Sequence, residues 1–288
     1  MLRDIKVLHL EPTDVCQAAC PLCARETNPE FNKTQQHHLD MHKIQQVFAV
    51  DRIAALDKMF MCGNYGDPAA GRHTLDIYKE FRKLNPDITL GMNTNGALQN
   101  THWWNKLGCI FDRPLDYVVF SIDGLEDTNH LYRKNVNWTK LIANAKAYIA
   151  AGGSAHWDML VYKHNQHQVD ACEQMARDIG CTWFRAKVSK RGFTDTLAAP
   201  VNWKLPQVQS TTIQCHALNE HSMYINAQGQ TSPCCWLGSR QPAVVTDFDS
   251  IRESWTGPRP HPICLSTCAS RNSSTSFTNQ WQREIQLC

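Results

Sequence analysis

Three cysteines near the start of the chain, Cys16, Cys20 and Cys23, follow directly after an apolar segment at residues 5–10. Their C-x3-C-x2-C spacing places three thiols on one short loop. Fe–S clusters are normally held by four cysteine thiolates, so three thiolates leave one iron of a four-iron cubane open. An open coordination position separates a reactive metal site from a closed structural one. The triad therefore predicts a reactive Fe–S site in the loop that follows the first strand. A zinc knuckle with a distant fourth ligand, or unligated thiols, are the alternatives.

The composition is that of an ordinary globular protein. The 288 residues are 42% hydrophobic and 19% charged, with a formal net charge of +2. This charge gives no general electrostatic case for binding nucleic acid or a membrane. Charges interrupt the first residues, which excludes a signal peptide, and no apolar run has the length of a transmembrane helix. Thirteen cysteines without a secretory signal indicate metal binding in a reducing compartment, and we expect a cytoplasmic protein.

Apolar runs typical of strands alternate with helical patterns from residue 5 to about residue 187. This alternation predicts βα units and a parallel sheet. The expected strands are residues 5–10, 58–61, 88–92, 117–122, 157–162 and 182–187, and the expected helices are 41–55, 74–84, 103–107, 138–150 and 168–179. Six such units predict an α/β fold, a partial (β/α)6 TIM-like barrel with ligands at the C-terminal ends of its strands. The cysteine triad follows the first strand and lies at that end.

Distinctive turns follow the next four expected strands. They are, in chain order, Cys62-Gly63-Asn64-Tyr65-Gly66-Asp67-Pro68, then Met92-Asn93-Thr94-Asn95-Gly96, then Ser121-Ile122-Asp123-Gly124 with Arg133 behind it, and Lys163-His164-Asn165. Glycines let a backbone approach a ligand closely, so that exposed carbonyls accept from an ammonium group. A guanidinium pairs a carboxylate in two bonds. The alternatives are a tight turn for the glycines, a surface arginine at a helix end for Arg133, and a helix N-cap for Asn165.

The triad and these turns together resemble the radical S-adenosylmethionine (SAM) superfamily, and within it the sulfatase-maturating and SPASM-type branch. In that family the open iron chelates the amino and carboxylate groups of SAM, and one electron cleaves SAM to a 5′-deoxyadenosyl radical. The resemblance implies a [4Fe-4S] cluster on Cys16, Cys20 and Cys23. It implies a SAM site at Gly63, Asn64, Gly66, Asp67, Pro68, Asn93, Asn95, Ser121, Arg133 and Asn165. Ser121 and Arg133 match the family's contacts to the SAM carboxylate, and Asp67 stands where a glutamate is usual.

The pattern changes after about residue 188. We expect a core at residues 1–188, a linker at 189–210 and a small α+β module at 211–288, with a hairpin at 222–231. Cys215 and Cys234 flank this hairpin, and Cys264 and Cys268 form a C-x3-C pair further on. This arrangement resembles a twitch-type module with one auxiliary [4Fe-4S] cluster on these four cysteines. A full SPASM module needs seven. A zinc ribbon-like site, Cys235 in place of Cys234, and a contribution from Cys288 remain alternatives.

The resemblance implies hydrogen abstraction from a substrate C–H bond, with the auxiliary cluster aiding electron transfer and a flavodoxin- or ferredoxin-type protein as external electron donor. We expect oxidation or modification of a small biosynthetic molecule. Peptide modification, such as crosslinking or epimerisation, is the alternative, and a non-catalytic Fe–S or zinc scaffold is the alternative of another class. Fifteen residues precede Cys16, so we expect no leader-binding domain there.

Candidate substrate-side residues at the strand ends are Asp158, Tyr162 and Arg185, which we interpret as catalytic, and Lys187. Each of them can instead be a polar group of the scaffold. The cysteines at 62, 109, 172 and 181 lie in apolar contexts, and we expect them to be buried, inert thiols.

Overall fold

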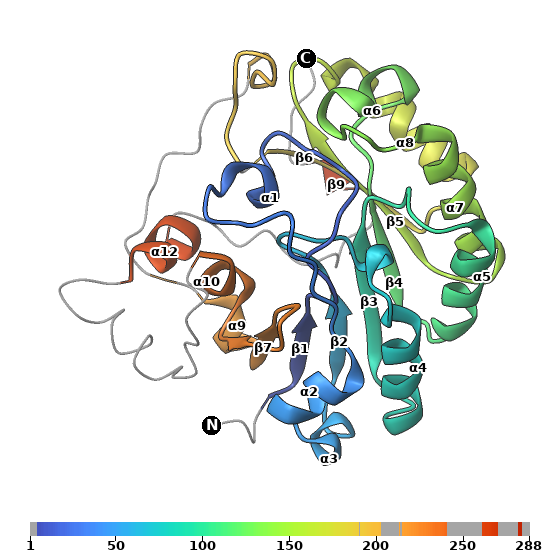
Figure 1. Cartoon of the computed structure of the whole chain (residues 1–288). Coiled ribbons are helices and arrows are strands. Elements are labelled where there is room, and N and C mark those ends of the chain that lie inside the picture. The colour runs from blue at the N-terminus through green and yellow to red at the C-terminus, as the bar shows by residue number, and fades with distance from the viewer. Residues whose placement is uncertain are drawn as a thin grey trace.

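The computed structural model describes residues 5–189, 191–202, 213, 215–240, 261–269 and 282–283. Its centre is a sheet of nine strands in the order β8-β7-β1-β2-β3-β4-β5-β6-β9. All pairs are parallel except β7 with β8. The core strands are β1 (Val7–Leu10), β2 (Lys58–Met61), β3 (Thr89–Thr94), β4 (Tyr117–Ser121), β5 (Ala155–Val161) and β6 (Trp183–Val188). This open, curved parallel sheet confirms the predicted partial barrel (Figure 1).

The helices connect these strands, and the longer ones cover the outer face of the sheet (Figure 1). They are α1 (Ala24–Thr27), α2 (Met41–Val47), α3 (Val50–Ile53), η2 (Pro68–Ala70), α4 (Thr74–Leu84), α5 (Thr101–Ile110), α6 (Glu126–Tyr132), α7 (Trp138–Ala150), η3 (Gln166–Gln168) and α8 (Val169–Asp178). The bounds of α4 and α7 are those predicted. The predicted helix at 41–55 is wrong as one element, because the backbone is extended at Phe48 and Ala49. The helices α1 and α6 were not predicted.

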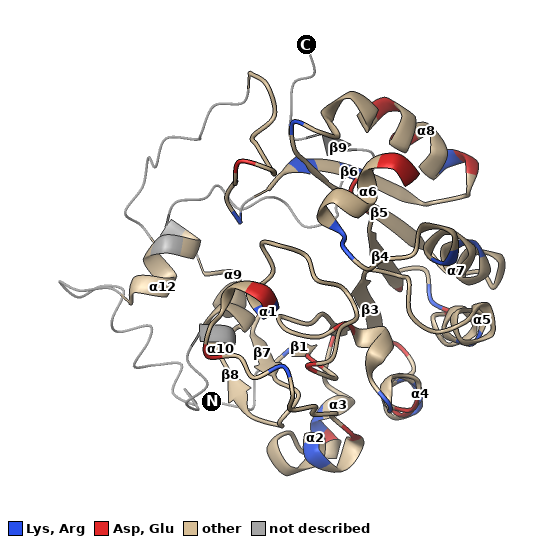
Figure 2. Cartoon of the chain, turned by 45° about the horizontal axis from the view of Figure 1, so that its top comes forward, with Lys and Arg blue, Asp and Glu red and all other residues tan. Residues whose placement is uncertain are grey.

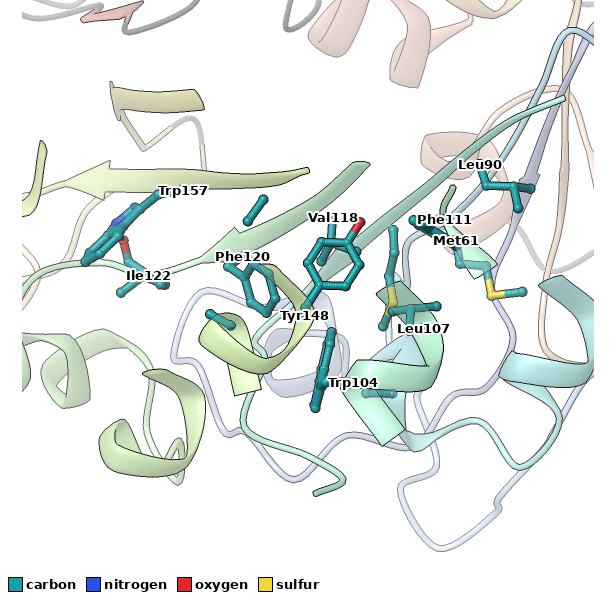
Figure 3. Packing of buried hydrophobic residues seen from close by; sticks show 14 of the residues in the cluster. Met61, Leu90, Trp104, Leu107, Phe111, Val118, Phe120, Ile122, Tyr148 and Trp157 are labelled. Carbon is teal, nitrogen blue, oxygen red and sulfur yellow. The ribbon is translucent and has the colours of Figure 1, made fainter. Parts of the chain in front are cut away.

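The core lies between the sheet and the helices α4, α5 and α7. Side chains of alternate strand positions, among them Met61, Val118 and Phe120, pack against Trp104 of α5 and Tyr148 of α7 (Figure 3). Successive side chains of a strand point to opposite faces of a sheet. The positions between these core residues therefore face the inner side of the barrel, and this parity decides which polar groups reach the site.

The C-terminal segment extends the same sheet. Strand β7 (Ser222–Ile225) pairs in parallel with β1, and β8 (Thr231–Ser232) returns antiparallel to β7. This confirms the predicted hairpin, and Gly229 supplies the positive φ of 82° in its turn. The remaining described elements here are α9 (His216–Asn219), α10 (Cys235–Arg240), α12 (Pro262–Cys264), η4 (Leu265–Ala269) and β9 (Gln282–Arg283), which pairs with β6.

The division at residues 188 and 210 stays a prediction, since most of the second half of the expected linker lies outside the described residues. In the part of the chain that the structure describes, no helix combines the length and the apolar character needed to cross a membrane.

Candidate functional site

The three thiols of the N-terminal triad each contact a polar group from a different strand end. The contacts are 3.7 Å from Asn95 Nδ2 to Cys16 Sγ, 3.8 Å from Cys23 Sγ to the Asn64 carbonyl oxygen, and 3.9 Å from Arg133 Nη1 to Cys20 Sγ. Asn64 follows β2, Asn95 follows β3, and Arg133 ends the helix after β4. Residues predicted to surround one cofactor are thus brought together around the triad.

Burial disfavours the thiolate forms of Cys16 and Cys20. Together with a smaller contribution from the nearby Asp67 carboxylate, it raises the pKa of Cys16 to about 12. Burial also raises the pKa of Cys20, while the Arg133 guanidinium opposes the rise. Metal ligation requires the deprotonated thiol, and the positive charge of an iron centre favours that form. The donor set and its burial fit the predicted [4Fe-4S] cluster.

Glycines let the loop after β2 lie against the loop of the triad. A Cβ on Gly66 would collide with the carbonyl oxygen of Thr13, and a Cβ on Gly63 would collide with the carbonyl oxygen of Gly66. Pro68 then starts the short helix η2, where its missing N–H is harmless. The run Gly63–Pro68 is therefore shaped by close backbone packing beside the cysteines.

Asp67 uses its carboxylate to hold the turn after β3. Its Oδ2 accepts from the backbone N–H of Asn95 at 2.7 Å and from Asn95 Nδ2 at 2.6 Å. Its Oδ1 accepts from Thr94 Oγ1 at 2.8 Å and from the N–H of Ala69 at 2.9 Å. Both oxygens are thus engaged. The structure assigns Asp67 a positioning role toward Asn95, so its direct contact with the SAM amine, as implied by the resemblance, stays a prediction.

Arg133 is held by a buried carboxylate at the end of β4. Its Nε donates to Asp123 Oδ2 at 2.6 Å, and Asp123 Oδ1 accepts from the N–H of Leu160 at 2.6 Å. This leaves the far end of the guanidinium directed at Cys20. Ser121 ends β4 on the inner face, next to Asp158 in register, while Asn93 is a half-buried inner-face position of β3. Ser121 therefore lies at the end of β4, and Asp123 holds the guanidinium of Arg133 at the same strand end.

Asn165 ties the ends of β4 and β5 together. Its Nδ2 donates to the carbonyl oxygens of Asp123, at 2.8 Å, and Leu160, at 2.9 Å, and its Oδ1 accepts from the N–H of Tyr162 at 2.7 Å. Asn165 precedes η3, but its side chain makes no capping hydrogen bond there. The side chain is fully buried and engaged with backbone groups, so its role in this structure is to hold the ends of β4 and β5 together.

A buried glutamate that the sequence analysis missed supports the loop after β2. Glu11 is 1% exposed, and its Oε1 accepts from the backbone N–H groups of Tyr65 at 2.7 Å and Gly66 at 3.2 Å. Burial raises the pKa of Glu11, against the effect of these hydrogen bonds. Its position directly after the apolar first strand was the available signal.

The same glutamate reaches the C-terminal segment. The Tyr224 hydroxyl on β7 donates to Glu11 Oε2. Asn64 Nδ2 then donates to the Tyr224 hydroxyl at 3.1 Å and to the Cys235 carbonyl oxygen at 3.0 Å. We call Glu11, Asn64 and Tyr224 the bridge. Glu11 and Tyr224 also line a cavity of about 210 Å³, together with Phe31 and Gln228 among others. None of the triad cysteines lines this cavity.

Charged groups of β5 and β6 form a second inner-face cluster. Asp158 Oδ1 lies 2.7 Å from Arg185 Nε, and its Oδ2 lies 2.5 Å from Lys187 Nζ. Burial alone would raise the pKa of Asp158, but attraction to Lys187 and Arg185 outweighs it and lowers the pKa to about 2. Tyr162 is fully buried, and burial raises its pKa. Asp158 is therefore poorly suited to accept a proton and Tyr162 to donate one, and the predicted catalytic roles stay untested predictions.

Four C-terminal cysteines surround one small apolar cavity of about 20 Å³. They are the predicted ligands Cys215, Cys234, Cys264 and Cys268. Burial raises the pKa of Cys234 to about 12, and the neighbouring thiols of Cys215 and Cys268 add to the rise. Among the described residues, no three histidine, cysteine or acidic side chains converge as ligands of a single ion would. A cubane instead binds each thiolate on a separate iron, so four cysteines around one cavity match the number of ligands that a cubane needs.

The other cysteines point elsewhere. The Cys235 thiol is buried near Cys62 and Glu11, on the side of the bridge, and Cys288 lies outside the described residues. Cys172 and Cys181 are buried as expected, and Cys62 is half-buried. The prediction for Cys109 is wrong, because this thiol is exposed on α5.

Comparisons with known proteins agree with this geometry. No curated protein matches the chain. Among solved structures, Streptococcus suis SuiB bound to S-adenosylmethionine aligns with a TM-score of 0.59 at 14% identity, over 82% of this chain and 61% of SuiB. SuiB bound to its precursor peptide SuiA gives the same score and identity over 83% and 61%. The protein anSMEcpe with AdoMet and the Cp18Cys peptide aligns with a TM-score of 0.56 at 14% identity, over 80% and 73%.

These likenesses establish the shared fold, and this chain spans about three fifths of the length of SuiB. The family model for the radical SAM superfamily matches residues 10–175, which include the triad and all four strand-end turns. The chain belongs to the radical SAM superfamily and is an enzyme of that superfamily.

Proposed function

We propose that this enzyme cleaves SAM reductively and abstracts a hydrogen atom from a substrate C–H bond, with a second [4Fe-4S] cluster aiding electron transfer. The observation that carries the proposal is the set of contacts between the three triad thiols and Asn64, Asn95 and Arg133. When bound, SAM and the first cluster supply the one-electron cleavage and the 5′-deoxyadenosyl radical. The chain's own residues supply position, charge and exclusion of water.

Arg133 has the charge and place to bind the SAM carboxylate beside Cys20. Asp123 holds its Nε, which leaves the other guanidinium nitrogens to form a paired contact with a carboxylate. The backbone carbonyls of the Gly63–Gly66 loop are the acceptors that an ammonium group needs, and the bridge from Glu11 holds that loop in place. Both ends of the amino acid part of SAM thus have partners of opposite charge or polarity.

The four C-terminal cysteines favour a fully ligated auxiliary cluster. Their cavity is apolar, with Leu237 and Ile263 in its wall, and a closed set of four thiolates leaves no iron free for a substrate. Such a centre suits electron transfer from a substrate radical. The same proposal includes a flavodoxin- or ferredoxin-type protein as the electron donor to the first cluster. It also includes a cytoplasmic location for the enzyme.

Modification of a small biosynthetic molecule remains our leading substrate class. Peptide modification is the second candidate, and it is supported by the peptides SuiA and Cp18Cys in two of the similar solved structures.

The test is formation of 5′-deoxyadenosine from SAM by the anaerobically reconstituted, reduced protein. We expect production by the native chain, none from the variant with Cys16, Cys20 and Cys23 all changed to Ala, and native production from Cys109→Ala. Cys109 is the matched control because its thiol is exposed on an outer helix. A native protein that carries a full complement of iron and still leaves SAM intact would contradict the proposal.

A further inference from the structure

Two cations on β6 face the inside of the barrel. Phe184, Ala186 and Val188 of this strand are buried in the core, so Arg185 and Lys187 between them point to the inner face. Figure 2 shows Lys and Arg positions in blue on β6. The strand register pairs Asp158 with both Arg185 and Ser121. Arg185 therefore shares a level with Ser121, a residue of the proposed SAM site, and Lys187 lies two residues further toward the end of the strand.

The two cations of this cluster share one carboxylate. Asp158 bonds to both of them, one through each carboxylate oxygen. Among the described contacts, Lys187 therefore has a single carboxylate oxygen as its acidic partner. The side chain of Lys187 is 22% exposed, against 10% for Arg185, so Lys187 is the cation with access to a ligand. A largely buried charge is costly unless it is paired, and an anionic ligand supplies that partner.

The other inner-face acids near Lys187 have partners of their own. The charges of Glu11, Arg191, Asp67 and Lys187 all act on the pKa of the Cys62 thiol after β2. Glu11 is occupied by Tyr224 and the loop after β2. Asp67 is occupied by Asn95 and Thr94. Neither described acid is therefore available to neutralise Lys187.

An aromatic layer lies below the cluster, toward the start of the strands. Trp183 lies two residues before Arg185 on the same face, and its ring centroid is 5.1 Å from that of His156. His156 stacks on Tyr117 at 5.2 Å, and Lys58 Nζ lies 4.8 Å from the centroid of the Tyr117 ring. A ligand therefore reaches Lys187 from the strand ends, where the cysteine triad lies.

We propose that Lys187, which shares the Asp158 carboxylate with Arg185, binds an anionic oxygen group of the substrate, a carboxylate or a phosphate. The inference rests on the proposed function, because it names the substrate class of the same site. The anchored anion would orient the rest of the substrate from β6 toward the cysteine triad.

The test uses the anaerobically reconstituted full chain with SAM bound, titrated with inorganic phosphate and separately with acetate at constant ionic strength. Calorimetry measures the dissociation constants. We expect saturable binding by the native protein. Lys187→Gln should weaken it at least about 10-fold, the effect of one charge-assisted hydrogen bond. Asp158→Asn removes the competing carboxylate and should tighten it about 3-fold or more. Lys146→Gln, on the exposed outer face of α7, is the matched control and should bind as the native protein does.

The opposite signs for Lys187→Gln and Asp158→Asn keep the test valid if one variant folds poorly, as judged by circular dichroism and iron content. Tighter binding of phosphate than of acetate assigns a phosphoryl group, and the reverse assigns a carboxylate. The inference is overturned if the native protein shows no saturable anion binding. It is also overturned if Lys187→Gln binds the anion with the affinity of the native protein. Formation of 5′-deoxyadenosine is measured in parallel, so that a native protein that cleaves SAM but shows no saturable anion binding refutes this inference alone.

Discussion

The two groups of cysteines differ in what surrounds them. Each thiol of the N-terminal triad touches a polar group from a distant strand end, whereas the four C-terminal thiols surround a small apolar cavity between short helices. A site that must bind a polar cofactor needs donors and acceptors at hand. A site that only passes electrons is better closed. The surroundings of a cysteine set thus distinguish the two expected roles better than the number of cysteines does.

The two regions are nevertheless connected. The bridge of Glu11, Asn64 and Tyr224 joins the loop after β2 to the C-terminal hairpin, and the carbonyl oxygen of Asn64 also contacts Cys23. The C-terminal segment therefore supports the first site directly through hydrogen bonds.

The largest expected effect comes from removing the triad. Changing Cys16, Cys20 and Cys23 together to Ala should remove about half of the bound iron, because we expect the proposed auxiliary cluster to stay on the C-terminal set. Iron analysis and electron paramagnetic resonance of the reduced protein measure this. Loss of all iron would show that the two sites do not load independently.

Removing the second set should separate the two roles. We expect Cys215→Ala with Cys234→Ala to lose about half of the iron as well, yet to keep formation of 5′-deoxyadenosine within about 3-fold of the native rate, a change under 1 kcal/mol in barrier. The measurement is iron content beside a time course of 5′-deoxyadenosine. Cys235→Ala is the matched control, since Cys235 is not among the residues that line the cavity. Equal iron loss in the control would contradict the assignment of Cys234.

A smaller effect tests the bridge. Tyr224→Phe leaves Glu11 Oε2 and Asn64 Nδ2 each without one partner, which should lower the free energy of unfolding by about 1–3 kcal/mol. SAM affinity should fall several-fold, because the loop after β2 loses support. Denaturant unfolding and SAM equilibrium binding measure the two effects. Tyr148→Phe removes a buried hydroxyl for which the described residues offer no hydrogen bond, and it should change neither quantity.

The smallest expected effect depends on pH. The pKa of Asp158 is lowered to about 2, so its ionised form stabilises the fold by roughly 2 kcal/mol. Because the pKa is depressed, this stability is fully present above about pH 4 and is lost as the pH falls toward 2. The stability difference between the native protein and Asp158→Asn should therefore stay constant from pH 7 to pH 5 and shrink only below pH 4. Rapid denaturant unfolding measures it. A difference that already shrinks between pH 7 and pH 5 would contradict the assignment.

Much of the fold was predictable from local patterns. Six apolar runs became the six core strands, and α4 and α7 have their predicted bounds. The helix predicted at 41–55 breaks at Phe48 because the chain turns there, which its apolar periodicity does not reveal. The pairing of β7 with β1 was not predicted, since it joins residues more than 200 positions apart.

The sequence by itself determined the cysteine spacing, the order of the strand-end turns and therefore the family. Local spacing suffices for these because parallel strands bring their C-terminal ends together. Only the tertiary structure decided that Asp67 holds Asn95, that Cys234 rather than Cys235 faces the cavity, and that Glu11 meets Tyr224. A side chain's partners come from segments far away in the chain, and strand register and burial select among them.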